Sequence, residues 1–255
     1  MDGRQSILVI LLMVASTSGC TKREMAKSSS VVSFREVSFA AHSFEVADVN
    51  HHLSDIQLYY LDARGQRIGT LEKLAQISAA SGRRLLFATN AGMFNPDFSP
   101  CGLLVQNGVE RAPLNLREGE GNFYLKPNGV FFIGRDGAKV VDATKYALVA
   151  ANVRLATQSG PMLVIDGQIH PKFAQHSNNR RIRSGAGVIS PEHVVFVLSR
   201  EPVTFYEFAS LFRDSLRCQN ALYLDGDISA FYRSDAPAPQ TPREYGVMIG
   251  VTTQR

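Results

Sequence analysis

The sequence has little excess charge of either sign, and it lacks the motifs with which proteins read nucleic acids. Its 27 lysines and arginines stand against 23 acidic residues, which leaves a formal net charge of +4 over 255 residues. There is no long basic run, no zinc-ligand spacing and no base-stacking motif, so we expect no nucleic-acid partner. Long repeats are also absent, and the apolar content of 45% is ordinary for one globular domain with a real core.

Long apolar runs are missing except near the N-terminus. Residues 7–15 follow Arg4 and are long enough for the apolar part of a signal peptide, but short for a membrane-spanning helix. The run leads to Ser18-Gly19-Cys20, which resembles a bacterial lipobox although Thr17 stands where an aliphatic residue is usual. We therefore predict a signal peptide over residues 1–20, with Cys20 lipidated.

A lipidated Cys20 would make this an exported protein of the periplasm or outer membrane, bound to the membrane through its lipid anchor. A cleaved soluble periplasmic protein and an uncleaved anchor are the alternatives. Residues 21–30 are charged or small, as expected of a tether, and residues 31–255 are expected to form a single domain.

Cysteines are few, and two remain after the signal segment. An oxidising compartment permits a disulfide between Cys101 and Cys218, but two unpaired thiols fit the sequence equally well. Neither cysteine has a histidine close by in the sequence. We therefore predict no thiol nucleophile.

The body of the chain predicts an α+β fold that is rich in β-structure. Apolar runs end in dipeptides that favour tight hairpin turns, at Asn107-Gly108, Asp136-Gly137 and Asp166-Gly167. Capping residues and helical spacing predict two main helices, over about 70–84 and 204–218. We expect a β-rich mixed sheet with several antiparallel hairpins.

Residues 222–229 form the most informative stretch. An apolar, β-favouring run stops at Asp225, Gly226 and Asp227, with the hydroxyl of Ser229 two residues further on. Strand alternation would place the two carboxylates and the hydroxyl on one side, while Gly226 lets the backbone approach a ligand closely. A turn whose aspartates bond only their own backbone is the alternative interpretation.

Three further polar clusters follow predicted strands, which is where binding and catalytic groups usually lie. They are Asn90 with Gly92 and Asn95, Ser159 with Gly160, and Arg183 with Ser184. A guanidinium group matches phosphate geometry with two parallel hydrogen bonds, so the arginine cluster favours an anionic ligand.

In their order along the chain and in their residues, these clusters resemble the successive signature motifs of the phosphodiester glycosidase family. The matching segments are residues 90–94, 159–164, 183–188 and 222–226 with Ser229, and the resemblance covers roughly residue 31 to the C-terminus. The family is typified by a lysosomal enzyme that removes N-acetylglucosamine from a phosphodiester on mannose. Asp227 is a departure, because the family commonly carries a glycine there.

The resemblance implies hydrolysis of a sugar-1-phosphodiester at the glycosidic carbon. It implies Asp225 as base or electrostatic stabiliser, Arg183 as phosphate clamp and Asn90 as a third catalytic group. Substrate-binding residues would be Ser159, Gly160, Ser184, Gly226, Asp227, Ser229, Gly92 and Asn95. Glu120 and Asp227 are both open as a second carboxylate. We expect no cofactor and no obligatory metal, although paired aspartates near a phosphate can recruit a divalent cation.

Two other functions remain compatible with parts of the sequence. A non-catalytic envelope lipoprotein could bind glycan or phosphate with the same groups. Residues 225–229 also imitate the aspartate-nucleophile motif of haloacid dehalogenase-type phosphatases, but only a short tail follows them, which leaves no room for the remaining α/β units.

Overall fold

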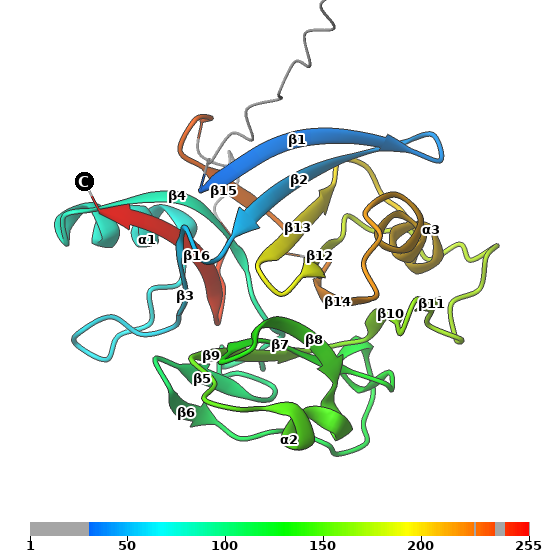
Figure 1. Cartoon of the computed structure of the whole chain (residues 1–255), viewed down its shortest axis with the longest axis horizontal. Coiled ribbons are helices and arrows are strands. Elements are labelled where there is room, and N and C mark those ends of the chain that lie inside the picture. Colours follow the sequence, from blue (N-terminus) through cyan, green and yellow to red (C-terminus); the bar gives the residue numbers. More distant parts are fainter. Residues whose placement is uncertain (1–30, 227, 238–242, 255) are drawn as a thin grey trace, which may run out of the picture.

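The computed structural model describes residues 31–226, 228–237 and 243–254. These residues form three β-sheets with short helices around them (Figure 1). The predicted signal peptide with Cys20, the tether and Asp227 lie outside the described residues. Among the described residues, no helix is long and apolar enough to cross a membrane.

The largest sheet has seven strands, in the order β1-β2-β13-β12-β14-β10-β11. β14 (Asn220–Asp225) pairs with β12 (Ser184–Ser190) on one side and β10 (Met162–Ile165) on the other. The apolar run before Asp225 is thus an interior strand, as predicted. The other strands of this sheet are β1 (Val32–Phe39), β2 (His42–Asn50), β13 (His193–Ser199) and β11 (Gln168–Ile169).

Two smaller sheets complete the architecture. The four-stranded sheet has the order β15 (Phe231–Arg233), β4 (Arg83–Asn90), β16 (Met248–Gln254) and β3 (Asp55–Tyr59). The five-stranded sheet has the order β6 (Val109–Ala112), β5 (Leu104–Gln106), β9 (Leu155–Ser159), β7 (Gly129–Gly134) and β8 (Gly137–Asp142).

The β-rich α+β class is confirmed, but the sheets are not mixed. Every strand pair among the described residues is antiparallel. Five of the pairs join consecutive strands, which are β1-β2, β5-β6, β7-β8, β10-β11 and β12-β13, and the other pairs join strands that are further apart in the chain. The turns at Asn107-Gly108 and Asp166-Gly167 form as predicted, whereas the turn between β7 and β8 consists of Arg135 and Asp136, with Gly137 already in β8.

Both predicted helices are present and shorter than expected. α1 (Leu71–Ala80) begins after the N-cap Thr70 and stops before Gly82, whose φ of +71° takes the chain out of the helix. α3 (Phe205–Ser210) has the predicted capping box of Thr204 and Glu207, and continues as a π-helical turn, η3 (Leu211–Ser215). The other helical segments are η1 (Asn122–Tyr124), η2 (Ala143–Lys145) and α2 (Tyr146–Val149).

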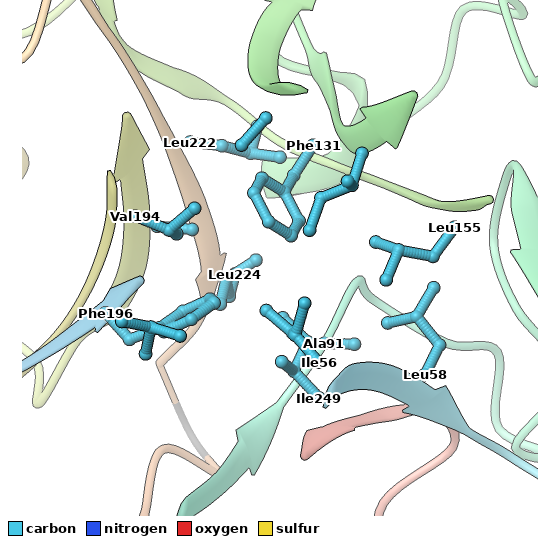
Figure 2. Packing of buried hydrophobic residues seen from close by; sticks show 14 of the residues in the cluster. Ile56, Leu58, Ala91, Phe131, Leu155, Val194, Phe196, Leu222, Leu224 and Ile249 are labelled. Carbon is cyan, nitrogen blue, oxygen red and sulfur yellow. The ribbon is translucent and has the colours of Figure 1, made fainter. Parts of the chain in front are cut away.

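The main hydrophobic core joins all three sheets (Figure 2). Leu222 and Leu224 of β14 gather there with Phe131 of β7 and Ile249 of β16, and all four side chains are fully buried. Because interiors are close-packed, this shared core fixes the sheets against one another. The strand ends that border it are therefore held in fixed relative positions.

The chain after Asp225 adds β15 and β16 to the four-stranded sheet. β14 is the last strand in the chain to join the large antiparallel sheet. The aspartate strand of a haloacid dehalogenase-type phosphatase is instead the first strand of a parallel α/β domain. This arrangement overturns the phosphatase alternative.

Candidate active site

Four strand ends meet where the three sheets join, and each carries a predicted site residue. Asn90 ends β4 in the four-stranded sheet, and Ser159 ends β9 in the five-stranded sheet. Ser184 begins β12, and its antiparallel partner in the register is Asp225, the last residue of β14. The residues predicted from separate motifs are thus brought together.

Hydroxyl groups connect these strand ends. The Ser184 Oγ lies 3.1 Å from the Asn90 Oδ1 and 3.1 Å from the carbonyl oxygen of Asp225. The Ser229 Oγ lies 3.0 Å from the Ser184 Oγ and 2.7 Å from the same carbonyl oxygen. Ser159 donates from its Oγ to the carbonyl oxygen of Leu224 at 2.9 Å. The three serines are buried, so their hydrogen bonds hold the strand ends in position.

The Asn90 side chain is buried and only half satisfied. Its Oδ1 lies 3.1 Å from the Thr89 Oγ1 and 3.1 Å from the Ser184 Oγ, while its Nδ2 has no hydrogen-bond partner among the described residues. Whichever way the amide is turned, one of its polar atoms lacks a partner. A buried polar group in this state costs about 1–3 kcal/mol, which a ligand oxygen or hydroxyl can recover.

The carboxylate of Asp225 is partly exposed and acts on two neighbouring side chains. Its Oδ1 accepts a hydrogen bond from the backbone N–H of Gly226. Burial raises the pKa of the Cys101 thiol, and the negative charges of Asp225 and Asp97 raise it further. Burial also raises the pKa of the Tyr245 hydroxyl, with a smaller contribution from Asp225. The charge of Asp225 therefore contributes to the raised pKa of both groups.

Arg183 is held in a buried, well-bonded position. Its side chain is 1% exposed, and its Nε and Nη2 donate to the carbonyl oxygens of Val203 and Asn179, each at 2.9 Å. Its guanidinium carbon lies 3.7 Å from the ring centroid of Phe205. These contacts fix the chain before β12, while the predicted role of Arg183 as phosphate clamp stays a prediction.

Three predicted glycines are required by close packing. A Cβ at Gly92 would lie 2.1 Å from the carbonyl oxygen of Gln158, and one at Gly160 would lie 2.7 Å from that of Phe123. A Cβ at Gly226 would lie 2.3 Å from the hydroxyl oxygen of Tyr223. Any larger residue would push the strand ends apart, so these glycines shape the site whether or not they contact the substrate.

Asn95 does not take part in the hydrogen bonds of Ser159, Ser184 and Ser229. Its Nδ2 donates to the Ser99 Oγ at 2.9 Å, and the residue lines a cavity of about 330 Å³ together with Cys101 and Arg117. Cys101, which lines this cavity, is also the thiol whose pKa is raised by burial and by the charge of Asp225. The size of the cavity suits a small ligand. Glu120, one of the two suggested second carboxylates, is exposed to solvent.

A family model described as phosphodiester glycosidase matches residues 83–252. The chain belongs to the phosphodiester glycosidase family. The family predicted from the four motifs is thereby confirmed, and the matched segment contains every described strand-end residue of the site, from Asn90 to Ser229.

Two individual proteins are similar to this phosphodiester glycosidase family member. The uncharacterized protein YigE of Escherichia coli (strain K12) is 34% identical over 205 residues, which cover 80% of this chain and 79% of YigE. The catalytic domain of zebrafish N-acetylglucosamine-1-phosphodiester alpha-N-acetylglucosaminidase, auto-inhibited by its pro-peptide, has a TM-score of 0.61 and 15% identity. That match covers 88% of this chain and 84% of the zebrafish chain, and shows that the two share a fold.

Several residues of the site carried no clear signal in the sequence of this family member. Thr89 reads as the interior of an apolar strand, yet its hydroxyl holds the Asn90 amide. Cys101 and Arg117 lie in loops without a motif and line the cavity. Among the described residues, no three His, Cys, Asp or Glu side chains are grouped as metal ligands.

Proposed function

We propose that this member of the phosphodiester glycosidase family hydrolyses the glycosidic bond of a sugar-1-phosphodiester, of the N-acetylglucosamine-1-phosphodiester type, in the cell envelope. One observation carries the proposal. A half-satisfied amide and three buried hydroxyls from separate motifs meet at one junction of three sheets, where they bond to one another and to the backbone of the strand end that carries the Asp225 carboxylate. Fixed polar groups of this kind can stabilise a charged transition state without reorganising.

The reaction exchanges one bond at the sugar C1 atom. The C1–O bond to phosphate breaks, the electron pair leaves with the phosphate oxygen, and the oxygen of water bonds to C1. A phosphate diester leaves as a stable monoester anion, so it needs less proton donation than an alcohol does. The positive charge that develops on the sugar ring would lie near Asp225, which serves as base towards water or as a fixed negative charge.

Asn90 and the cavity suit the remaining parts of such a substrate. The unpaired amide atom of Asn90 would bond a sugar hydroxyl or a phosphate oxygen. The cavity beside Cys101 would take the part of the substrate that projects past Asp225. Ser184 and Ser229 would act through Asn90 and the Asp225 backbone, because their hydroxyls bond to those groups.

The envelope location rests on the N-terminal sequence alone. The apolar run at residues 7–15 and the lipobox-like end at Cys20 support export and lipid anchoring of a single catalytic domain over residues 31–255. Labelling cells with a radioactive fatty acid tests the anchor. Loss of the label in a Cys20→Ser variant is expected, and equal labelling of that variant would contradict the proposal.

The decisive test of function uses an N-acetylglucosamine-1-phosphodiester in heavy-oxygen water. Label in the released sugar is expected, because water attacks C1. Label in the phosphate would instead identify a phosphodiesterase, and no turnover across a panel of glycosyl phosphodiesters would favour a binding protein. The same assay with a chelator tests the expectation that no divalent cation is required. Loss of activity that one cation restores would overturn it.

A further inference from the structure

Lys126 carries a buried side-chain amine that forms no hydrogen bond or salt bridge with the described residues. Its Nζ is buried and has no hydrogen-bond partner among the described residues, although other atoms of the residue are partly exposed. The described part of the chain also contains no salt bridge to Lys126. A dehydrated, unpaired cation is costly, and proteins normally pair it with an anion.

The backbone around Lys126 is held against the strand ends of the active site. Pro127 accepts a hydrogen bond at its carbonyl oxygen from the backbone N–H of Met162 at 2.9 Å, and Pro161 accepts one from Tyr223 at 3.1 Å. Two backbone hydrogen bonds thus connect Pro127, through the neighbouring residues Met162 and Pro161, to Tyr223 of β14. Tyr223 lies two residues before Asp225.

A second set of contacts ties Lys126 to the surroundings of Arg183. The His170 Nε2 lies 3.1 Å from the carbonyl oxygen of Lys126, and the His170 ring stacks on Phe173 with centroids 4.7 Å apart. Phe173 stacks in turn on Phe205 at 4.8 Å, and Phe205 carries the guanidinium of Arg183 on its face. The backbone of Lys126 is therefore connected to the surroundings of both Arg183 and β14.

Arg183 and Lys126 differ in what they already bind. Arg183 donates from its Nε to the carbonyl oxygen of Val203 and from its Nη2 to that of Asn179. Lys126 has no such bond, and the other buried side-chain atom without a partner in the described chain is the Asn90 Nδ2. Both unpaired groups are donors as assigned, and an oxygen of an anion is a suitable partner for each.

We propose that Lys126 binds the phosphate of the substrate, in the role that the sequence motifs suggest for Arg183. The ligand class is a phosphorylated sugar, and its identification as a substrate rests on the proposed function. The contribution is a charge-assisted hydrogen bond from the Lys126 Nζ to a phosphate oxygen. Neutral sugars gain nothing from it, so Lys126 sets the preference for phosphate-bearing ligands.

The test is calorimetric titration of the purified full-length protein with N-acetylglucosamine-1-phosphate and with N-acetylglucosamine. In Lys126→Met, affinity for the sugar phosphate is expected to fall about ten- to a hundredfold, as for a lost charged hydrogen bond. Affinity for the neutral sugar should not change. Lys172→Met is the matched control, because Lys172 is an exposed lysine close to His170, and it should leave both affinities at the wild-type value.

A folded Lys126→Met protein with wild-type affinity for the sugar phosphate would overturn the proposal. So would a wild-type protein that binds the two ligands equally. Lys126→Gln provides the same comparison with a polar side chain if the methionine variant does not fold. Sugar-phosphate binding that depends on Lys126, without turnover of any phosphodiester, would sustain this inference while contradicting the proposed hydrolysis.

Discussion

The Ser184 hydroxyl lies 3.1 Å from the amide oxygen of Asn90, across 94 residues of sequence. This contact joins β12 of the seven-stranded sheet to β4 of the four-stranded sheet. The bond from Ser159 to the carbonyl oxygen of Leu224 joins β9 of the five-stranded sheet to β14 in the same way. Side-chain bonds between sheets therefore bring Asn90 and Ser159 to the strand ends where Ser184 and Asp225 already pair within the large sheet.

Removing the Ser184 hydroxyl should loosen the Asn90 amide. We expect Ser184→Ala to lose about 1–2 kcal/mol of unfolding free energy, because the Asn90 Oδ1 and the Asp225 carbonyl oxygen lose a buried partner. Turnover should fall about tenfold or more if Asn90 contacts the transition state. Urea denaturation and steady-state kinetics measure the two effects. Ser190→Ala, at the far end of β12, should change neither the unfolding free energy nor the turnover rate. Equal effects of the two variants would show that Ser184 has no specific role in the site.

Asp225→Asn should abolish most of the activity while leaving the fold intact. The substitution keeps the shape of the side chain and removes the negative charge that serves as base or stabiliser, so kcat should fall about a thousandfold or more. Asp166→Asn is the control, because Asp166 lies in the exposed turn between β10 and β11 at a φ of +48°, which asparagine also adopts. A wild-type rate in Asp225→Asn would remove Asp225 from the mechanism.

Much of this site could be predicted from the sequence, because its residues sit at strand ends. The apolar run before Asp225 and the turn residues after Asn90 locate two of the four ends directly, and Ser159 and Ser184 follow from the same rule. The three-sheet junction could not be predicted. Periodicity reports which face of a strand is buried, not which distant strand covers it.

Arg183 and Lys126 show the same limit of prediction from sequence. Arg183 stands beside serine and glycine in the sequence, which favours an anion site, yet it is 1% exposed and bonded to carbonyl oxygens. Lys126 precedes Pro127 in what reads as a solvated turn, yet its Nζ is buried. Local composition cannot distinguish them, because burial of a long cationic side chain is decided by tertiary neighbours.

Arg183→Lys should reduce stability more than its conserved charge suggests. Lysine cannot reproduce the two donors to Val203 and Asn179 or lie flat on Phe205, so we expect a loss of about 2–3 kcal/mol of unfolding free energy. Arg181→Lys, at an exposed neighbouring position, should be neutral. Denaturation of both variants provides the measurement. A stable Arg183→Lys protein with weakened sugar-phosphate binding would instead return the phosphate clamp to Arg183.

Acid should destabilise the start of α3. Burial raises the pKa of Glu207, but hydrogen bonds from Thr204 and Arg180 outweigh it and lower that pKa from 4.5 to about 2. Because the pKa is lower in the folded state, the carboxylate contributes fully above about pH 4.5, and its contribution is lost as the pH falls towards 2. His42, whose Nε2 lies 3.5 Å from the Glu207 Oε1, and Glu201 on the other side of that ring also face this group.

Denaturation of wild type and Glu207→Gln near neutral pH and at about pH 3 measures the effect. The glutamine variant should be less stable than wild type at neutral pH, and the difference should shrink in acid. Glu118→Gln, at an exposed position, should track wild type throughout. A stability difference that stays constant with pH would show that the titration of Glu207 contributes nothing.

Cys101 offers a chemical probe of the cavity that it lines. Both Cys101 and Cys218 are free thiols; Cys101 is partly exposed and lines the cavity, whereas burial raises the pKa of Cys218 to about 12. The thiolate is the reactive form, and the pKa of Cys101 is also raised, so alkylation should be slow near neutral pH and accelerate as the pH rises. A bulky reagent at Cys101 should inhibit turnover, and bound sugar phosphate should slow the reaction. Cys101→Ser should resist inhibition, which would show that the inhibition arises from alkylation of Cys101 and not of another cysteine. Full activity after complete alkylation of Cys101 would show that the substrate does not enter this cavity.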